Sequence, residues 1–273
     1  MASSSSKVET ESASFFEGSG CERVCVPSRR GSSRTISDGV LSRFSCRAFL
    51  GSKMPKEDDV RDIVAKACRA ASGGNLQPWH VFVLAGRERR RLVEAVRVKV
   101  AKGEVEMPQY PMYPDSLGGE LDDVYKQRRR KLGYAMYSLM GIKRKEKEKR
   151  AAAMARNWEF FDAPVGIIIA IDRQMNAPQY ADLGIFIQNI GVLARERGLH
   201  TCYQESWSVY PETVASTLGI SDKFIVFCGI AMGYADWTDP VNNLVSTRAP
   251  LDQVVHFCGL DGCDDAATIK AKL

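Results

Sequence analysis

The chain has 273 residues, of which 45% are hydrophobic and 26% are charged, and its formal net charge is +5. These values are those of an ordinary globular protein with room for one sizeable domain. The longest apolar run, residues 165–171, is too short to span a bilayer, and no apolar signal-peptide core lies near Met1, so membrane insertion and secretion are both disfavoured. We expect a soluble, intracellular protein.

Residues 1–36 form a serine-rich stretch with few bulky apolar side chains. Such a segment cannot offset the entropy of ordering, so we expect a disordered extension. Its serines and its arginines, Arg29, Arg30 and Arg34, are typical of an organelle transit peptide, whereas its glutamates are not. The location therefore stays open between the cytoplasm and an organelle that uses this extension as a targeting segment.

Two basic and polar segments follow. Arg43-Phe44-Ser45-Cys46-Arg47 puts two guanidinium groups and a hydroxyl within five residues. Residues 72–80 put small residues and two amides between a predicted helix, 59–71, and a predicted strand, 80–84. Together these groups suit an anionic ligand with polar edges, such as flavin mononucleotide (FMN). The alternative is an exposed charged loop followed by an ordinary helix-to-strand turn.

Basic runs occupy residues 126–131 and 143–150. The second run alternates in sign, and no aromatic residues lie between its basic residues to stack on bases. A solvated helix face is the better interpretation, so no nucleic-acid partner is expected. The eight cysteines lack paired CxxC spacing and histidine partners, so we expect free thiols and no metal site.

The second half of the chain alternates strands and helices. Strands are predicted at 164–172, 200–203 and 224–231, and helices at 182–197 and 211–218. This alternation indicates an α/β sandwich and by itself inclines towards a parallel sheet, although strand order cannot be read from it. The helix at 182–197 is apolar on most sides, which makes it a candidate dimer helix. No helix opens with a Gly-x-Gly-x-x-Gly motif or a P-loop, which disfavours a Rossmann site.

Five blocks resemble the FMN-dependent nitroreductase family in order and spacing, and they are similar in particular to its nitrobenzoate-reductase-like branch. These blocks are residues 43–49, 72–79, 161–166, 204–207 and 228–235, with Ser246-Thr247-Arg248 after the last. The resemblance covers about residues 42–256. It implies an α+β fold, a three-layer α/β/α sandwich with a mostly antiparallel central sheet flanked by helices, in a homodimer with FMN at each subunit interface.

The resemblance also implies domain boundaries and residue roles. The FMN-binding domain would span residues 37–257, with a helical lid insertion at 104–157 and a C-terminal tail at 258–273. Arg43 and Arg248 would hold the FMN phosphate, Ser45 the phosphate or ribityl chain, and Arg47 the pyrimidine edge near N1 and O2. The cofactor-binding residues implied are Arg43, Phe44, Ser45, Arg47, Ser72, Gly73, Gly74, Asn75, Gln204, Glu205, Ser206 and Arg248.

Catalytic roles are implied for Arg47 and for the backbone amides of Glu205 and Ser206 near flavin N5, and residues 72–75 would reach the flavin of the partner subunit. The family often has glycine at the position of Ser206. A cation near N1 favours the reduced flavin, and an amide at N5 tunes hydride acceptance without a titrating side chain.

The implied activity is reduction of nitroaromatic compounds, with quinones as alternative acceptors, by a ping-pong hydride mechanism that uses NADH or NADPH. Two alternatives remain open, a flavin-dependent reductive dehalogenase of halogenated aromatics and a non-catalytic flavin-binding protein. The tyrosines and basic residues of the lid would frame a planar small-molecule acceptor. Alternatively, its apolar residues simply pack the lid on the core.

Overall fold

This computed structural model of the chain describes residues 28–117 and 119–258. Residues 28–244 form one compact unit, and residues 245–258 belong to a second, whose described part contains the short 3₁₀ helix η6 (Leu251–Gln253). Most of the serine-rich extension and of the expected tail, residues 1–27 and 259–273, lies outside the described residues. No described helix is long and apolar enough to cross a membrane.

The first unit is built on four strands. They are β1 (His80–Ala85), β2 (Val165–Asp172), β3 (His200–Gln204) and β4 (Phe224–Gly233), in the spatial order β1-β2-β4-β3. All three pairings are antiparallel, so the sheet implied by the family resemblance is confirmed and the inclination towards a parallel sheet is wrong. Every residue of β2 is buried, and a strand covered on both faces is a continuous apolar run whichever way its neighbours point.

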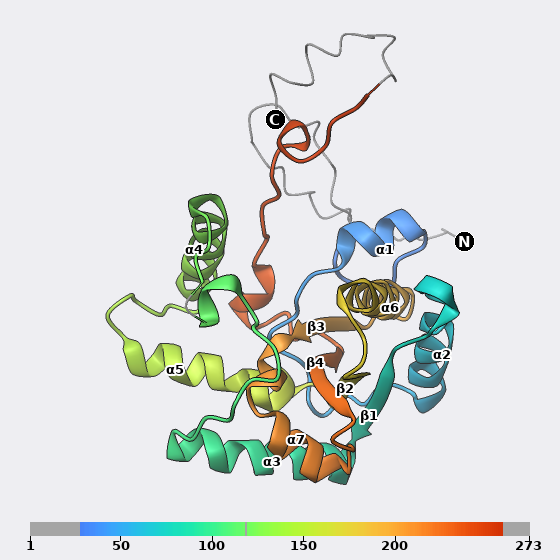
Figure 1. Ribbon diagram of the computed structural model, residues 1–273. Coiled ribbons are helices and arrows are strands. Elements are labelled where there is room, and N and C mark those ends of the chain that lie inside the picture. Colours follow the sequence, from blue (N-terminus) through green and yellow to red (C-terminus); the bar gives the residue numbers. More distant parts are fainter. Residues whose placement is uncertain (1–27, 118, 259–273) are drawn as a thin grey trace, which may run out of the picture. The chain divides into compact units, whose positions relative to one another are not determined.

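Helices cover both faces of the sheet (Figure 1). The helices are α1 (Ile36–Ser42), α2 (Glu57–Ala67), α3 (Gly86–Lys102), α4 (Asp123–Leu139), α5 (Lys147–Ala155), α6 (Ala177–Glu196) and α7 (Pro211–Leu218). On one face, α2 and α6 pack on Ile167 and Ile169 of β2, and on the other, α3 and α7 pack with Ile168 and Ala170. The expected three-layer sandwich is therefore present.

Two helix boundaries differ from the expected ones, and local sequence explains the first. Helix α6 begins five residues before Asp182, because Asn176 and Gln179 form a capping box around its first turn and Pro178 suits that turn. Helix α2 ends at Ala67, four residues earlier than expected. The buried side of α6 runs from Leu183 to Ala194, while Ile185 on another side is exposed.

The expected lid contains α4 and α5, and neither helix buries a residue in the described chain. Val124 is 48% exposed and Leu132 is 37% exposed. Met136 and Leu139 of the same helix are half-buried, so the interpretation that the apolar residues of the lid pack on the core of their own chain fails only for Val124 and Leu132. The pattern marks an apolar face correctly, but it does not say what covers that face.

Residues 28–34, assigned by composition to the extension, make specific contacts with the first unit. The backbone N–H of Ser33 donates to the Arg195 carbonyl at 2.8 Å. The Arg195 guanidinium, only 1% of whose residue surface is exposed, donates in turn to the carbonyls of Arg29 at 2.9 Å and Gly31 at 2.7 Å. These contacts attach the end of the extension to α6.

Candidate functional site

Arg43 follows directly after α1 and carries a guanidinium group that has no ion pair within residues 28–117 and 119–258. The group lies 5.4 Å from the centre of the Tyr203 ring on β3. Gly191 of α6 provides the room, since a Cβ there would collide with the Tyr203 hydroxyl and lie 3.1 Å from Arg43 Cδ. Arg43 Nε is shielded from solvent and has no hydrogen-bond partner among the described residues. A buried donor of this kind is costly unless a ligand supplies the acceptor.

The segment after Arg43 runs beside β3. Ser45 forms a parallel bridge with Thr201, and the N–H of Cys46 donates to the Thr201 carbonyl at 3.0 Å. The hydroxyl of Thr201 is buried and meets no hydrogen-bond partner that the structure describes. The backbone of this segment is therefore fixed next to the strand that also carries Tyr203.

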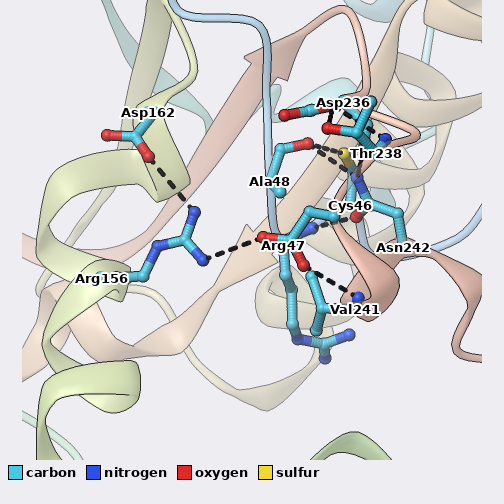
Figure 2. A network of polar contacts seen from close by, with 10 residues as sticks. Cys46, Arg47, Ala48, Arg156, Asp162, Asp236, Thr238, Val241 and Asn242 are labelled. Atoms are coloured by element: carbon cyan, nitrogen blue, oxygen red, sulfur yellow. Dashed lines mark hydrogen bonds and ion pairs between the residues drawn. The ribbon is translucent and has the colours of Figure 1, made fainter. Parts of the chain in front are cut away.

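A buried asparagine holds the backbone of Arg47 (Figure 2). Asn242 lies in η5 (Pro240–Asn243), accepts from the N–H of Arg47 at 2.9 Å, and donates to the carbonyls of Ala48 at 2.8 Å and Asp236 at 2.7 Å. The side chain of Arg47 points away from this network, and its Nη1 donates to the Ser45 carbonyl at 3.2 Å. Sequence reasoning missed Asn242, because its partners are distant in the chain.

The end of β3 presents the next predicted residues. Glu205 and Ser206 open the 3₁₀ helix η4 (Glu205–Val209), so their backbone N–H groups have no preceding turn to bond to. The Ser206 carbonyl accepts from Trp158 Nε1 at 2.8 Å, while the Ser206 hydroxyl is buried and has no hydrogen-bond partner among residues 28–117 and 119–258. This residue thus combines an orphaned hydroxyl with a backbone N–H that has no partner within its own helix.

Other predicted side chains at this end have structural partners. Gln204 donates to the Asn157 carbonyl at 2.6 Å and accepts from Trp207 Nε1 at 3.3 Å. The ring of Phe44 is buried against His200 and Trp237. Any contact of Gln204 or Phe44 with a ligand would therefore come through the backbone.

The predicted turn at residues 72–75 packs against a different part of α6 from the part that contacts Arg43. Its 3₁₀ helix η1 (Gly73–Asn75) is tied down where the Gly73 N–H donates to Asp182 at 3.2 Å, and Gly73, Gly74 and Asn75 are exposed. Nine residues of helix separate Asp182 from Gly191, the neighbour of Arg43, which is about 14 Å along the axis at 1.5 Å per residue. The structure does not bring this turn next to Arg43 within one chain.

Arg248 belongs to the second unit. Its guanidinium donates to the Ser246 hydroxyl at 2.8 Å and to the Thr247 carbonyl at 3.1 Å. Its predicted partnership with Arg43 stays a prediction.

The titratable groups near Arg43 are held neutral. Burial raises the pKa of Tyr203 to about 12 and raises the pKa of the Cys46 and Cys202 thiols above the usual range. Burial, reinforced by Arg195, lowers the pKa of His200 to about 3. The described residues contain no group of three or more potential metal ligands. The neutral groups around Arg43 are suited to binding and orienting a ligand rather than to acid–base chemistry.

The chemistry of the donors fits FMN. An unpaired guanidinium matches a phosphate, and the orphaned hydroxyls of Ser206 and Thr201 match the polar groups of a ribityl chain or ring edge.

Comparisons with known proteins place the same residues in a known family. The model of the nitroreductase family matches residues 40–234. A 4-nitrobenzoate reductase of Nocardioides sp. (strain LMS-CY) is 35% identical over 220 residues, 80% of this chain and 87% of the relative. A nitrobenzene nitroreductase of Ectopseudomonas oleovorans is 33% identical over 223 residues, 81% of this chain and 96% of the relative.

Solved structures agree with these relatives. The FMN and NADPH-dependent nitroreductase NfnB from Sphigopyxis sp. strain HMH has a TM-score of 0.79 and 36% identity, and the match covers 83% of this chain and 100% of that one. The FMN-dependent nitroreductase NfnB from Mycobacterium smegmatis, solved in complex with NADPH, has a TM-score of 0.76 and 30% identity, with 81% and 97% covered.

Proposed function

The chain belongs to the nitroreductase family, and from this premise we propose that it is an FMN-dependent oxidoreductase that reduces nitroaromatic compounds with NADPH or NADH. The observation that carries the proposal is the half-buried Arg43, whose Nε is shielded from solvent and has no acceptor among the described residues. The relatives named above supply the substrate class, since one is named for 4-nitrobenzoate and another for nitrobenzene.

Arg43 would hold the FMN phosphate together with Arg248, and Ser45 the phosphate or ribityl chain. Arg47, with its backbone fixed by Asn242, would place a positive charge at the pyrimidine edge. The free N–H groups of Glu205 and Ser206 would face N5. A bound FMN supplies two-electron redox chemistry between a nicotinamide and a nitro group. No side chain of this set needs to exchange a proton for that role.

The active form would be a homodimer of the domain formed by residues 37–257, with FMN at each subunit interface. Two observations support this assembly. The turn at residues 72–75 is exposed and lies about 14 Å along α6 from the neighbour of Arg43, so it is free to reach a flavin of the partner subunit. The lid helix α4 buries none of its apolar residues in its own chain.

The visible spectrum of the purified protein, followed without oxygen, tests the function. We expect flavin absorption that bleaches on addition of NADPH or NADH and returns on addition of 4-nitrobenzoate or nitrobenzene. A colourless protein that does not bind added FMN would overturn the proposal that FMN is the cofactor. A flavin that is reduced but stays reduced with both nitro compounds would overturn the acceptor class, and halogenated aromatics would be tried next.

A further inference from the structure

A cavity of about 600 Å³ lies between α4 and α5, at a place that the proposed flavin site does not use. One wall is a single face of α4, formed by Arg130, Gly133, Tyr134 and Tyr137. The other wall comes from α5 and the loop before it. Its volume is within the range of small-molecule sites, which is about 300–1,000 Å³.

The charges around the cavity are all positive. Arg130, Lys143, Arg144 and Arg150 line it, and no acidic residue does. None of these four side chains forms an ion pair with a carboxylate of the described chain. Their neighbours on the same helices differ, because Arg129 pairs with Asp115 at 2.6 Å and Lys149 with Glu146 at 2.6 Å. Four cations without a carboxylate partner among the described residues therefore line one cavity.

Arg150 supplies the most specific sign of a missing acceptor. Its Nε is shielded from solvent and has no hydrogen-bond partner in the described part of the chain. Guanidinium groups bind phosphates and carboxylates through several N–H groups at once. An anion in the cavity would give this nitrogen the acceptor that the protein does not provide.

Gly133 gives the cavity room for a ring. It lies inside α4, where glycine costs about 0.5–1 kcal/mol relative to alanine, and a Cβ there would meet nothing within 4 Å. No packing constraint therefore explains the glycine. Tyr134 and Tyr137 flank it on the same face and offer aromatic surface to a planar group.

The cavity stays accessible in the proposed dimer. At 3.6 residues per turn, Val124 and Leu132 lie on one side of α4, and Arg130, Gly133 and Tyr137 lie on roughly the opposite side. A partner subunit that covers the apolar side leaves the cavity open.

We propose that this cavity binds the phosphorylated adenosine end of NADPH, with the cations around the 2′-phosphate and the tyrosines beside the adenine. The inference rests on the proposed function, which supplies a nicotinamide donor. Several unpaired cations match a dianionic phosphate better than a monocarboxylate acceptor. Because NADH lacks the 2′-phosphate, the cavity would make NADPH the preferred donor.

Adenosine 2′,5′-bisphosphate is the probe, titrated calorimetrically into the FMN-loaded protein. Arg144→Gln together with Arg150→Gln should weaken its binding about tenfold or more, since each removes a charged donor. Gly133→Leu, which fills the cavity without removing charge, should do the same. Lys149→Gln is the matched control, because this α5 cation already has its own carboxylate and does not line the cavity.

Steady-state kinetics give the second readout. The KM for NADPH should rise by a similar factor in Arg144→Gln/Arg150→Gln, with the KM for NADH and both kcat values unchanged. Gly133→Leu, which blocks the adenine that both nicotinamides share, should raise both KM values. Equal affinity for the bisphosphate in the wild type and all variants would overturn the inference. So would a rise in the KM for 4-nitrobenzoate alone, which would assign the cavity to a carboxylate acceptor. A flavin that neither nicotinamide reduces would overturn the proposed function instead, and the calorimetric result would still stand by itself.

Discussion

The position of the Arg43 guanidinium depends on two residues that no motif marks. The Tyr203 ring lies beneath it, and Gly191 leaves space for both side chains. Motif spacing could predict Arg43 and Arg47, because they lie within one short segment and share one chemistry. It could not predict Tyr203 or Gly191, because their roles arise from contacts between elements that are far apart in the sequence.

At this scale we predict that Tyr203→Leu weakens FMN binding by about 2- to 30-fold, because a cation–π contact contributes about 0.5–2 kcal/mol. Tyr203→Phe should bind FMN like the wild type, since it keeps the ring and loses only a hydroxyl that lacks a well-formed hydrogen bond in the described part of the chain. Quenching of FMN fluorescence on titration with apoprotein measures both affinities.

Two controls accompany this test. Arg43→Ala should lose FMN more severely than Tyr203→Leu, because it removes the charge itself. The melting temperatures of the apoproteins show whether Tyr203→Leu acts only by loosening the core. Identical affinities in the leucine and phenylalanine variants would show that the ring does not position Arg43.

At the scale of elements, the sequence predicts the four strands well and their directions poorly. The apolar run of β2 identifies a strand buried on both faces, and this property is common to both kinds of sheet. The antiparallel sheet is predicted from the resemblance of five short sequence blocks to a known family. The periodicity of apolar residues cannot predict it. The lid gives a second example. The sequence predicts that α4 has an apolar face, but it does not predict which surface covers that face.

The attachment of residues 28–34 to α6 and β3 has a pH dependence. His200 Nε2 donates to the Arg29 carbonyl at 2.9 Å, and Arg195 and Arg29 are the charged groups that surround the ring. Burial lowers the pKa of His200 to about 3, from 6.5 in an unfolded chain. As the pH falls below 6.5, His200 binds a proton in the unfolded chain but not in the folded chain. The free energy of unfolding therefore decreases.

We therefore predict that His200 removes about 2 kcal/mol from the free energy of unfolding between pH 7.5 and pH 5. His200→Gln keeps a donor for the Arg29 carbonyl but does not titrate, so its stability should fall by that much less over the same interval. Urea unfolding at each pH gives both curves. Parallel curves for the two proteins would mean that His200 is protonated in the folded state.

At the scale of the whole molecule, one chain holds two parts of the proposed flavin site in separate places. Arg43, Arg47 and Ser206 cluster around β3 and the segments beside it, while the turn at residues 72–75 is anchored at Asp182. The sequence predicts a dimer through the family resemblance. The structure adds an exposed apolar surface that a partner subunit could bury. That surface is the apolar side of α4, with Val124 and Leu132 exposed.

We predict that Val124→Glu combined with Leu132→Glu shifts the protein from dimer to monomer, because burying two unpaired carboxylates at an interface costs several kcal/mol. Sedimentation velocity over a range of protein concentrations measures the shift. The monomer should also lose FMN, because residues 72–75 of the partner would no longer reach it. Val98→Glu on α3, where an equally apolar residue is 44% exposed, is the matched control and should remain a yellow dimer. A double variant that stays dimeric and retains FMN would place the interface on another surface and leave α4 free in solution.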